Sequence, residues 1–439
     1  MLRQWRGGRL YFLLLTIVLC WATANINLSR SWNQVLEYDI AGYYAYLPAV
    51  FIYHDLNFGF YEPVRDRYHS DRDRGDYRYV TESGAVVDKY YAGTAVAQAP
   101  FFAVGHLATV VTGRPQDGYS YYYIVALALS SVAYTLLGLY FFERILGWYG
   151  VRVRYRWLVI YAIAFGTNVF VYAVVDPGMS HPYSLACITG LAWWFLRFHD
   201  TGRQRYYLLM AAAFGLVVLI RPINLIVLPG LFALLPSRTQ AVVVLQRLAA
   251  LRWRLAWGVL LVAAICSLQL LIYWLQTGHW VVYSYGEEGF NWLQPAVVDF
   301  LFSYRKGFFL YTPLALVSTL ALIHLYRWSR YQAASLLLFL ALLVYVFSSW
   351  WSWWYGGGFS ARVMLEYSAF VFLPLALLLE RAGSVLRRLT VGSVILLTLF
   401  AQMQIYQFRY EQIHYSEMTR EQYWDKFLRL DLIVFGGGE

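Results

Sequence analysis

Long apolar runs separated by short polar connectors make up most of the chain. Most runs cover roughly 17–25 residues, the length that an α-helix needs to cross a bilayer core. They are continuous, without the alternation that a membrane β-barrel requires. The pattern predicts an all-α, polytopic membrane bundle of about eleven spans. These lie at 10–26, 119–142, 157–175, 180–197, 206–220, 222–236, 255–276, 308–326, 333–350, 363–380 and 390–408.

One further apolar segment, 92–112, is interrupted by Pro100, Gly105 and His106. An additional crossing here would reverse the side of every later connector. We therefore interpret it as an amphipathic, juxtamembrane helix lying in the outer interface.

Arginine fixes the predicted orientation of the chain. The basic connectors fall on one side of the membrane if the N-terminus is cytoplasmic, as the positive-inside rule requires. An odd number of spans then leaves the C-terminus outside. Cleavage of the first span after Ala22-Thr23-Ala24 remains an alternative. The basic connectors are 144–156, 197–205, 238–254, 327–330 and 381–388.

This topology divides the chain into a transmembrane domain, 1–408, and an outer tail, 409–439. Two large outer loops, 27–118 and 277–307, interrupt the domain, and a shorter Trp- and Gly-rich loop covers 350–362. The first loop holds most of the extramembrane acids. These are Glu37, Asp39, Asp55, Glu62, Asp66, Asp71, Asp73 and Asp76.

Composition agrees with a membrane protein. Hydrophobic residues make up 60% of the chain and charged residues 14%, whereas soluble domains have about a quarter charged residues. The net charge of +10 resides largely in the connectors, so no nucleic-acid partner is expected. Aromatic residues reach 19%, which fits either interfacial anchoring or a cleft for a sugar or lipid.

The first candidate site begins just outside the first span, at Glu37-Tyr38-Asp39, and continues through Tyr43 and Tyr44. On a helix Asp39 and Tyr43 share a face. Partial desolvation there would raise the pKa of the Asp39 carboxyl, which suits a general base. A helix-capping or solvated loop acid is the structural alternative.

Four cations on the predicted outer side are candidates for binding a phosphate: Lys89, Arg305, Lys306 and Arg362. The positive-inside rule does not account for basic residues on the outer side of the membrane. Such cations can stabilise a phosphate leaving group. Snorkelling to lipid headgroups is the alternative for Lys89.

Three more polar residues are candidates for substrate binding: His181, Arg221 and Glu288. Charges at a membrane edge usually have a partner or a function. Capping or surface exposure is the alternative for His181. No nucleotide-binding or metalloprotease motif is present, so the sequence indicates no nucleotide-activated cytoplasmic reaction and no particular cofactor. The outer acids are compatible with a divalent metal, although no spacing demands one.

In their order and sidedness these residues resemble the C-type superfamily of integral-membrane glycosyltransferases, which includes the protein O-mannosyltransferases and the aminoarabinose transferase of lipid A. The matching patterns are Asp39 with Tyr43-Tyr44, Lys89 through Pro100-Phe101-Phe102, Ser180-His181, Arg221-Pro222, and Trp353 through Arg362. The chain departs from the family at Ile40, where many members have a second acid, and at Tyr90-Tyr91, where a proline pair is common.

The resemblance implies transfer of a sugar from a polyprenyl-phosphate donor to a lipid, glycan or protein acceptor, outside a bacterial cytoplasmic membrane. It implies that Asp39 is the base, and that Lys89, with Arg305 or Arg362, holds the donor phosphate. Displacement of that phosphate would invert the anomeric centre. Two alternatives remain: a transporter or flippase, and a non-catalytic subunit of an envelope polysaccharide system. A polymerase or ligase of surface glycans differs mainly in donor length.

Overall fold

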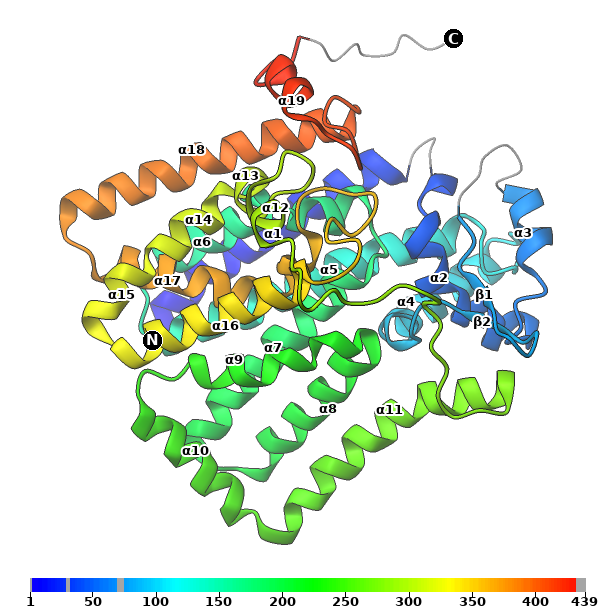
Figure 1. Ribbon diagram of the computed structural model, residues 1–439, viewed down its shortest axis with the longest axis horizontal. Coiled ribbons are helices and arrows are strands. Elements are labelled where there is room, and N and C mark those ends of the chain that lie inside the picture. Colours follow the sequence, from blue (N-terminus) through cyan, green and yellow to red (C-terminus); the bar gives the residue numbers. More distant parts are fainter. Residues whose placement is uncertain (1, 29–31, 69–74, 432–439) are drawn as a thin grey trace.

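The computed structural model describes residues 2–28, 32–68 and 75–431; Asp71, Asp73 and the last eight residues of the tail lie outside these ranges. The described chain is almost entirely helical (Figure 1). Its α-helices are α1 (Leu2–Asn27), α2 (Tyr38–Pro48), α3 (Tyr61–Tyr68), α4 (Gly93–Val111), α5 (Tyr121–Trp148), α6 (Val153–Gly166), α7 (Ser180–Thr201), α8 (Gln204–Ile220), α9 (Val227–Ala233), α10 (Arg238–Ala250), α11 (Leu255–Thr277), α12 (Val297–Phe302), α13 (Phe308–Tyr311), α14 (Pro313–Leu320), α15 (Leu322–Trp328), α16 (Arg330–Ser348), α17 (Ser368–Arg381), α18 (Ser384–Arg409) and α19 (Arg420–Lys426).

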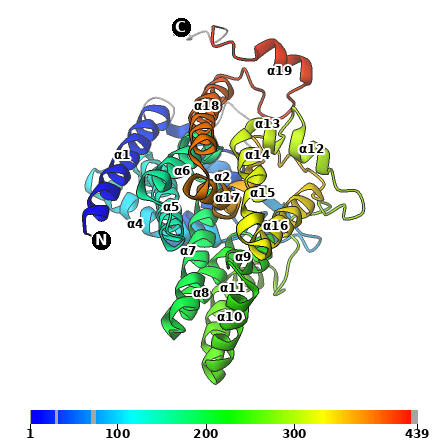
Figure 2. The same ribbon diagram turned by 90° about the vertical axis from the view of Figure 1, so that its left-hand side faces the viewer.

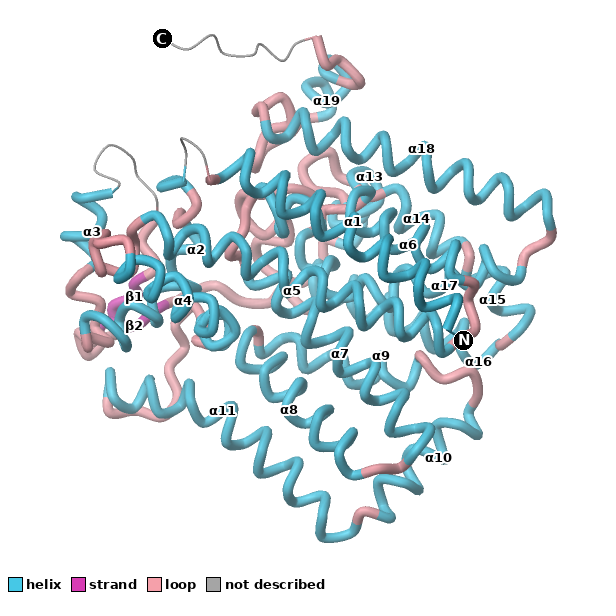
Figure 3. Tube along the Cα trace, turned by 180° about the vertical axis from the view of Figure 1, so that it is seen from behind, coloured by secondary structure: helices cyan, strands magenta, loops and turns pink. Residues whose placement is uncertain are grey.

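Short elements join these helices. The single sheet within the described residues is a hairpin of β1 (Arg78–Val80) and β2 (Val86–Asp88), seen beside α3 and α4 in Figure 3. Short 3₁₀ and π turns lie at Trp32–Gln34, Ala49–Tyr53, Val171–Val175, Pro222–Ile226, Arg252–Arg254 and Arg362–Tyr367.

Seven helices of the described chain are long and apolar enough to cross a membrane, or eight if the bent pair around α9 and α10 forms one span. A helical membrane protein is therefore supported, whereas eleven uninterrupted spans are not reproduced. Helix occurs at every predicted segment, but several segments are broken. Pro313, for example, interrupts the predicted span 308–326 between α13 and α14, because proline removes a backbone donor and clashes with the preceding turn. The segment interpreted as interfacial, now α4, is itself among the seven.

Burial separates an inner helix from outer ones. In the most apolar 18-residue stretch of the span that contains α17, 94% of the residues are buried, against 17% in the corresponding stretches of the spans of α11 and α18. Figure 2 accordingly places α17 near the middle of the bundle and α18 at its edge. In a bilayer the apolar outer faces of α11 and α18 contact lipid, because nothing in the described chain covers them.

The two ends of the molecule differ in what they carry. Figure 1 places α10, α15 and the turn from α17 to α18 at one end, and α2, α3 and the β-hairpin at the other. The first end carries the arginine-rich connectors. The second end carries the first outer loop, so the predicted segregation of basic connectors from the acidic loop is present in the fold.

Candidate functional site

Two cavities meet at one pair of side chains. The first has a volume of about 480 Å³ and the second about 720 Å³. Asp39, Gly356 and Arg362 line both of them. The carboxylate and guanidinium therefore form part of the wall between the two cavities.

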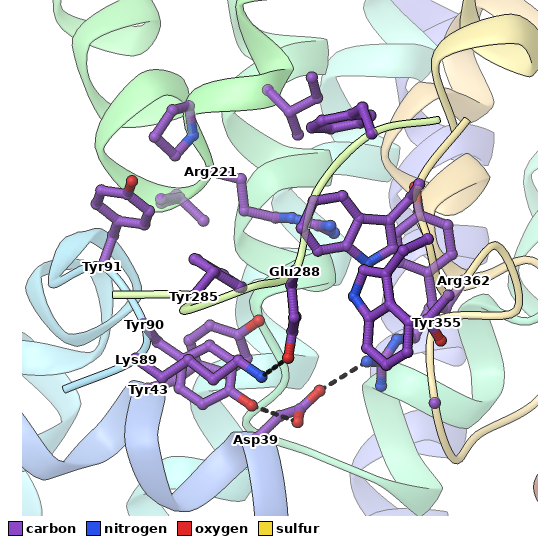
Figure 4. A pocket seen from close by; sticks show the side chains of 18 of the residues that line it. Asp39, Tyr43, Lys89, Tyr90, Tyr91, Arg221, Tyr285, Glu288, Tyr355 and Arg362 are labelled. Atoms are coloured by element: carbon purple, nitrogen blue, oxygen red, sulfur yellow. Dashed lines mark hydrogen bonds and ion pairs between the residues drawn. The ribbon is translucent and has the colours of Figure 1, made fainter. Parts of the chain in front are cut away.

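Asp39 is held by a cation and a hydroxyl. Arg362 Nη2 lies 2.6 Å from Asp39 Oδ2, and the Tyr90 hydroxyl donates to Asp39 Oδ1 at 2.5 Å (Figure 4). Asp39 also occupies the first turn of α2, where the helix dipole favours a negative charge.

The expected rise in the pKa of Asp39 is wrong. Burial does raise the pKa of this carboxyl, but the Arg362 guanidinium and the Tyr90 hydroxyl outweigh burial and hold it below its ordinary value. An opposite charge and a donated hydrogen bond both favour the ionised form. Asp39 is therefore a carboxylate at neutral pH, which keeps it able to accept a proton.

The β-hairpin and a glycine bring Tyr90 to Asp39. Lys89 N donates to Tyr77 O at 2.8 Å, which extends the hairpin pairing to the residue before Tyr90. Gly42, on α2, faces the Tyr90 ring, and a Cβ there would lie 2.4 Å from Tyr90 Cδ2. Because Gly42 has no side chain, the ring approaches α2 closely enough to bond the carboxylate.

Cations and aromatic rings line the first cavity. Lys89 Nζ lies 2.5 Å from Glu288 Oε1 and 5.4 Å from the centroid of the Tyr285 ring (Figure 4). Half of the lining residues are aromatic: Tyr43, Tyr90, Tyr91, Tyr283, Tyr285, Phe290, Trp350, Trp351, Trp354 and Tyr355. A backbone bridge between Phe290 and Trp350 ties the second outer loop to the Trp-rich loop and so places Glu288 opposite Lys89.

Arg221 reaches the first cavity from the end of α8. Its Nη1 lies 2.8 Å from Oε1 of Glu366, which is fully buried. His181 Nδ1 bonds the same oxygen at 2.7 Å, and the Asn224 amide donates to Oε2. His181 is thus a buried partner of Glu366, neither a surface residue nor part of the lining of either cavity.

A close helix contact sets the position of Arg221. A Cβ on Gly93, the first residue of α4, would lie 2.3 Å from the backbone nitrogen of Ile220. The start of α4 therefore touches the end of α8 directly. This contact joins the segment that follows Lys89 to the helix end that carries Arg221, and both side chains line the first cavity.

The second cavity has a mixed lining of acids, amides and apolar side chains. It is lined by Glu37 and Asp176, by the amides of Asn27 and Gln34, and by the C-terminal segment from Phe408 to Tyr415. Asp176 follows the π turn Val171–Val175, and such turns are frequent at functional sites. Burial raises the pKa of the Asp176 carboxyl to about 6, against the opposing effect of Arg362 and Lys306.

A glycine loop divides the cavities, and Lys306 anchors it. Gly356 (φ +67°) and Gly358 (φ +142°) adopt conformations that favour glycine. The ammonium of Lys306 donates to the carbonyls of Gly358 and Tyr415, and burial lowers its pKa well below the ordinary value. This contact fastens the C-terminal tail to the loop.

Arg305 also holds the tail. It lies 3.6 Å from the centroid of the Trp354 ring and donates to Ser416 O at 2.8 Å. Neither Arg305 nor Lys306 lines a cavity, so the geometry gives no support to their predicted contact with a phosphate. Both side chains turn away because backbone carbonyls of the loop and the tail satisfy them.

The structure brings most of the other candidates together. The first cavity contains Asp39, Tyr43, Lys89, Arg221, Glu288 and Arg362, and the second contains Glu37. Tyr44 lies on another face of α2, buried among aromatic rings, and its hydroxyl donates to Gly118 O at 2.5 Å.

Four residues that line the cavities were not among the predicted site residues: Tyr90, Tyr285, Tyr355 and Asp176. Tyr90 directly follows Lys89, and Asp176 opens the Asp-Pro-Gly turn before His181, so both had a local signal. Nothing in the sequence distinguishes Tyr285 or Tyr355 from the many other tyrosines.

Among the described residues, no group of three or more His, Cys, Asp or Glu side chains is arranged to hold a metal ion. No protein-family model matches the chain, and a search of curated proteins found no significant match.

Proposed function

We propose that the protein is a membrane glycosyltransferase that moves a sugar from a polyprenyl-phosphate donor to an acceptor outside the cytoplasm. One observation carries the proposal: an acid that can act as a base lies between two cavities with different linings. The first cavity is rich in aromatic rings and has more cations than acids, and the second has more acids than cations. A lipid-linked sugar phosphate suits the first, because it presents apolar, sugar and anionic parts together.

In this proposal Asp39 takes the proton from an acceptor hydroxyl that enters from the second cavity. The hydroxyl oxygen attacks the anomeric carbon as the bond from that carbon to the phosphate oxygen breaks. The bonding electrons leave with the phosphate, and the anomeric centre inverts. Lys89, Arg221 and Arg362 stabilise the charge on the departing phosphate, and Asp39 later returns its proton to solvent.

Arg362 has two roles in this sequence of events. In the free protein it neutralises Asp39. A phosphate in the first cavity offers a second anion to the same guanidinium, which can bind two anions through its several donors. When Arg362 also binds the phosphate, its ion pair with Asp39 becomes weaker. The pKa of the Asp39 carboxyl then rises towards a value better suited to a base.

Separation of the basic connectors from the first outer loop supports a multi-pass orientation in a bacterial cytoplasmic membrane, with the N-terminus inside and both cavities at the outer side.

The test is native mass spectrometry of the purified protein with polyprenyl phosphate. Saturable binding is expected for the wild type and weaker binding for Lys89→Ala. Lys426→Ala is the matched control, because the Lys426 side chain lies outside both cavities. Binding no tighter than that of a phospholipid, or an equal loss in both variants, would contradict a donor site in the first cavity. With a donor bound, Asp39→Asn should lower the rate of transfer about 10²- to 10⁴-fold.

A transporter of a polar solute is the second candidate, and one observation favours it. Glu366 is fully buried in the bundle and bonded to His181 and Arg221, and buried ionisable groups are common in transport pathways. Solute uptake into proteoliposomes that persists in Asp39→Asn would favour transport over transfer.

A further inference from the structure

The second cavity differs from the first in the sign of its charge. Its lining holds four acids, Glu37, Asp39, Asp176 and Glu411, and two arginines, Arg362 and Arg409. The lining of the first cavity holds two acids, Asp39 and Glu288, and three cations, Lys89, Arg221 and Arg362. The first cavity therefore favours an anionic ligand, and the second disfavours one.

Asp176 is the acid of the second cavity whose hydrogen-bonding capacity is unused. Within the described ranges its carboxylate has no hydrogen-bond partner and no ion pair. Arg362 and Lys306 are near enough to act on its charge, but they bond to Asp39 and to backbone carbonyls instead. A carboxylate offers about four acceptor positions, so this one can receive donors from a ligand.

The remaining lining mixes polar and apolar side chains, with four aromatic rings, those of Tyr38, Tyr172, Phe408 and Tyr415. Asn27 and Gln34 contribute side-chain amides from one side. The C-terminal tail closes the other side with Glu411, Ile413 and Tyr415. In contrast, ten aromatic rings line the first cavity. A lipid tail is thus better accommodated in the first cavity, and a compact polyhydroxylated group in the second.

We propose that the second cavity binds the acceptor, and that the part bound there is a saccharide without negative charge, either neutral or carrying an amine, whose hydroxyl or ammonium groups donate to Asp176. This inference rests on the proposed function and names its acceptor class. A lipid acceptor would have to present a sugar headgroup to this cavity. An acceptor that bears a phosphate or carboxylate near the reacting hydroxyl is disfavoured, because Glu37, Asp176 and Glu411 repel it.

The test uses the full chain in lipid nanodiscs and three probes that share one ring: glucose, glucosamine and glucuronate. Saturation-transfer NMR should show binding of glucosamine and glucose and little of glucuronate. Asp176→Asn should weaken glucosamine binding roughly 10- to 100-fold, because a charge-assisted hydrogen bond is lost. Asp66→Asn, at an exposed position in α3, should leave it unchanged.

Two further measurements keep the outcome decisive. Polyprenyl phosphate should still bind Asp176→Asn, which shows that the variant is folded and that the first cavity is intact. If Asp176→Asn does not fold, Glu411→Gln on the tail replaces it, with a smaller loss of glucosamine binding expected.

Several results would overturn the inference. These are equal binding of all three probes, no saccharide binding at all, or glucosamine that polyprenyl phosphate displaces, since displacement would place the sugar in the first cavity. If instead polyprenyl phosphate fails to bind the wild type while glucosamine binds and depends on Asp176, the donor proposal fails and the second cavity remains a saccharide site.

Discussion

The guanidinium of Arg362 lies 2.6 Å from the carboxylate of Asp39, although 323 positions separate the two residues in the chain. Asp39 comes from the first outer loop, and Arg362 ends the Trp- and Gly-rich loop before α17. Each side chain is less than a quarter exposed, so the pair is partly screened from water. Its position between two cavities makes it the centre of the site.

Replacing Asp39 by Asn should remove activity and also reduce stability. We expect transfer to fall about 10²- to 10⁴-fold, the usual contribution of general-base catalysis. Arg362 would lose its anion, and leaving a partly buried donor without its partner costs about 1–3 kcal/mol. Transfer assays and thermal unfolding measure the two effects. An Asp39→Asn protein with normal transfer would show that Asp39 is not the base.

The hydrogen bond from the Tyr90 hydroxyl should lower the pKa of the Asp39 carboxyl. In Tyr90→Phe the donated hydrogen bond is lost, so the pKa of the carboxyl rises and the acidic limb of the pH–rate profile moves to higher pH. Tyr91→Phe is the matched control, because Tyr91 lines the same cavity without donating to Asp39. A shift of the acidic limb in both variants, or in neither, would argue against this role.

Asp176 should make stability depend on pH in a distinctive direction. Its pKa is raised to about 6 in the folded chain, so the folded state binds more protons than the unfolded state between about pH 4 and pH 6. Stability from this group is therefore present at low pH and is lost as pH rises through 6. Asp176→Asn should remove that loss and stabilise the protein at pH 7.5 by about 1–2 kcal/mol. Thermal unfolding of both proteins at pH 4.5 and pH 7.5 tests the prediction. It is wrong if, at pH 7.5, Asp176→Asn is no more stable than the wild type.

The contact of Gly93 with α8 should be intolerant of a side chain. A Cβ there would overlap the backbone at Ile220, and overpacking costs about 1–3 kcal/mol. Gly93→Ala should also weaken phosphate binding, because it pushes the end of α8, where Arg221 lies, away from the start of α4. Gly392→Ala in α18 is the control, since a Cβ at Gly392 meets nothing within 4 Å. That change should be neutral or stabilising by up to about 1 kcal/mol.

Lys306 should hold the C-terminal tail in place. Lys306→Met keeps the length of the side chain but leaves the carbonyls of Gly358 and Tyr415 without their donor. Limited proteolysis should then cleave the segment after Arg409 faster than in the wild type. Lys426→Met, near the end of the same tail, should not have this effect. Equal cleavage rates in the wild type and Lys306→Met would show that Lys306 does not anchor the tail.

The sequence predicted the helices better than the spans. Apolar runs of the right length mark where helix forms, because hydrophobicity and helix propensity act locally. Breaks depend on local chemistry and on packing that the runs do not reveal. Gly166, which ends α6, lies so close to α14 that a Cβ would sit 2.4 Å from Leu314 Cδ1. No hydropathy pattern reports such a contact.

For the candidate site, too, the sequence predicted some of the residues but not their interactions. Asp39, Lys89 and Arg362 were identified by their residue type and side of the membrane, and all three line the first cavity. The pKa of Asp39 was predicted in the wrong direction, because it depends on Arg362 and Tyr90, which are distant in sequence. Arg305 and Lys306 have the charge of a phosphate site, but the carbonyls of the loop and the tail determine where they point.

The ion pair between Asp39 and Arg362 also couples two binding equilibria. A proton on Asp39 frees Arg362 for another anion, and an anion that occupies Arg362 makes Asp39 easier to protonate. By thermodynamic reciprocity each event favours the other by the same factor. The affinity of the first cavity for an anion should therefore increase as pH falls through the pKa of Asp39, so the proton acceptor and the anion-binding arginine titrate as one linked unit.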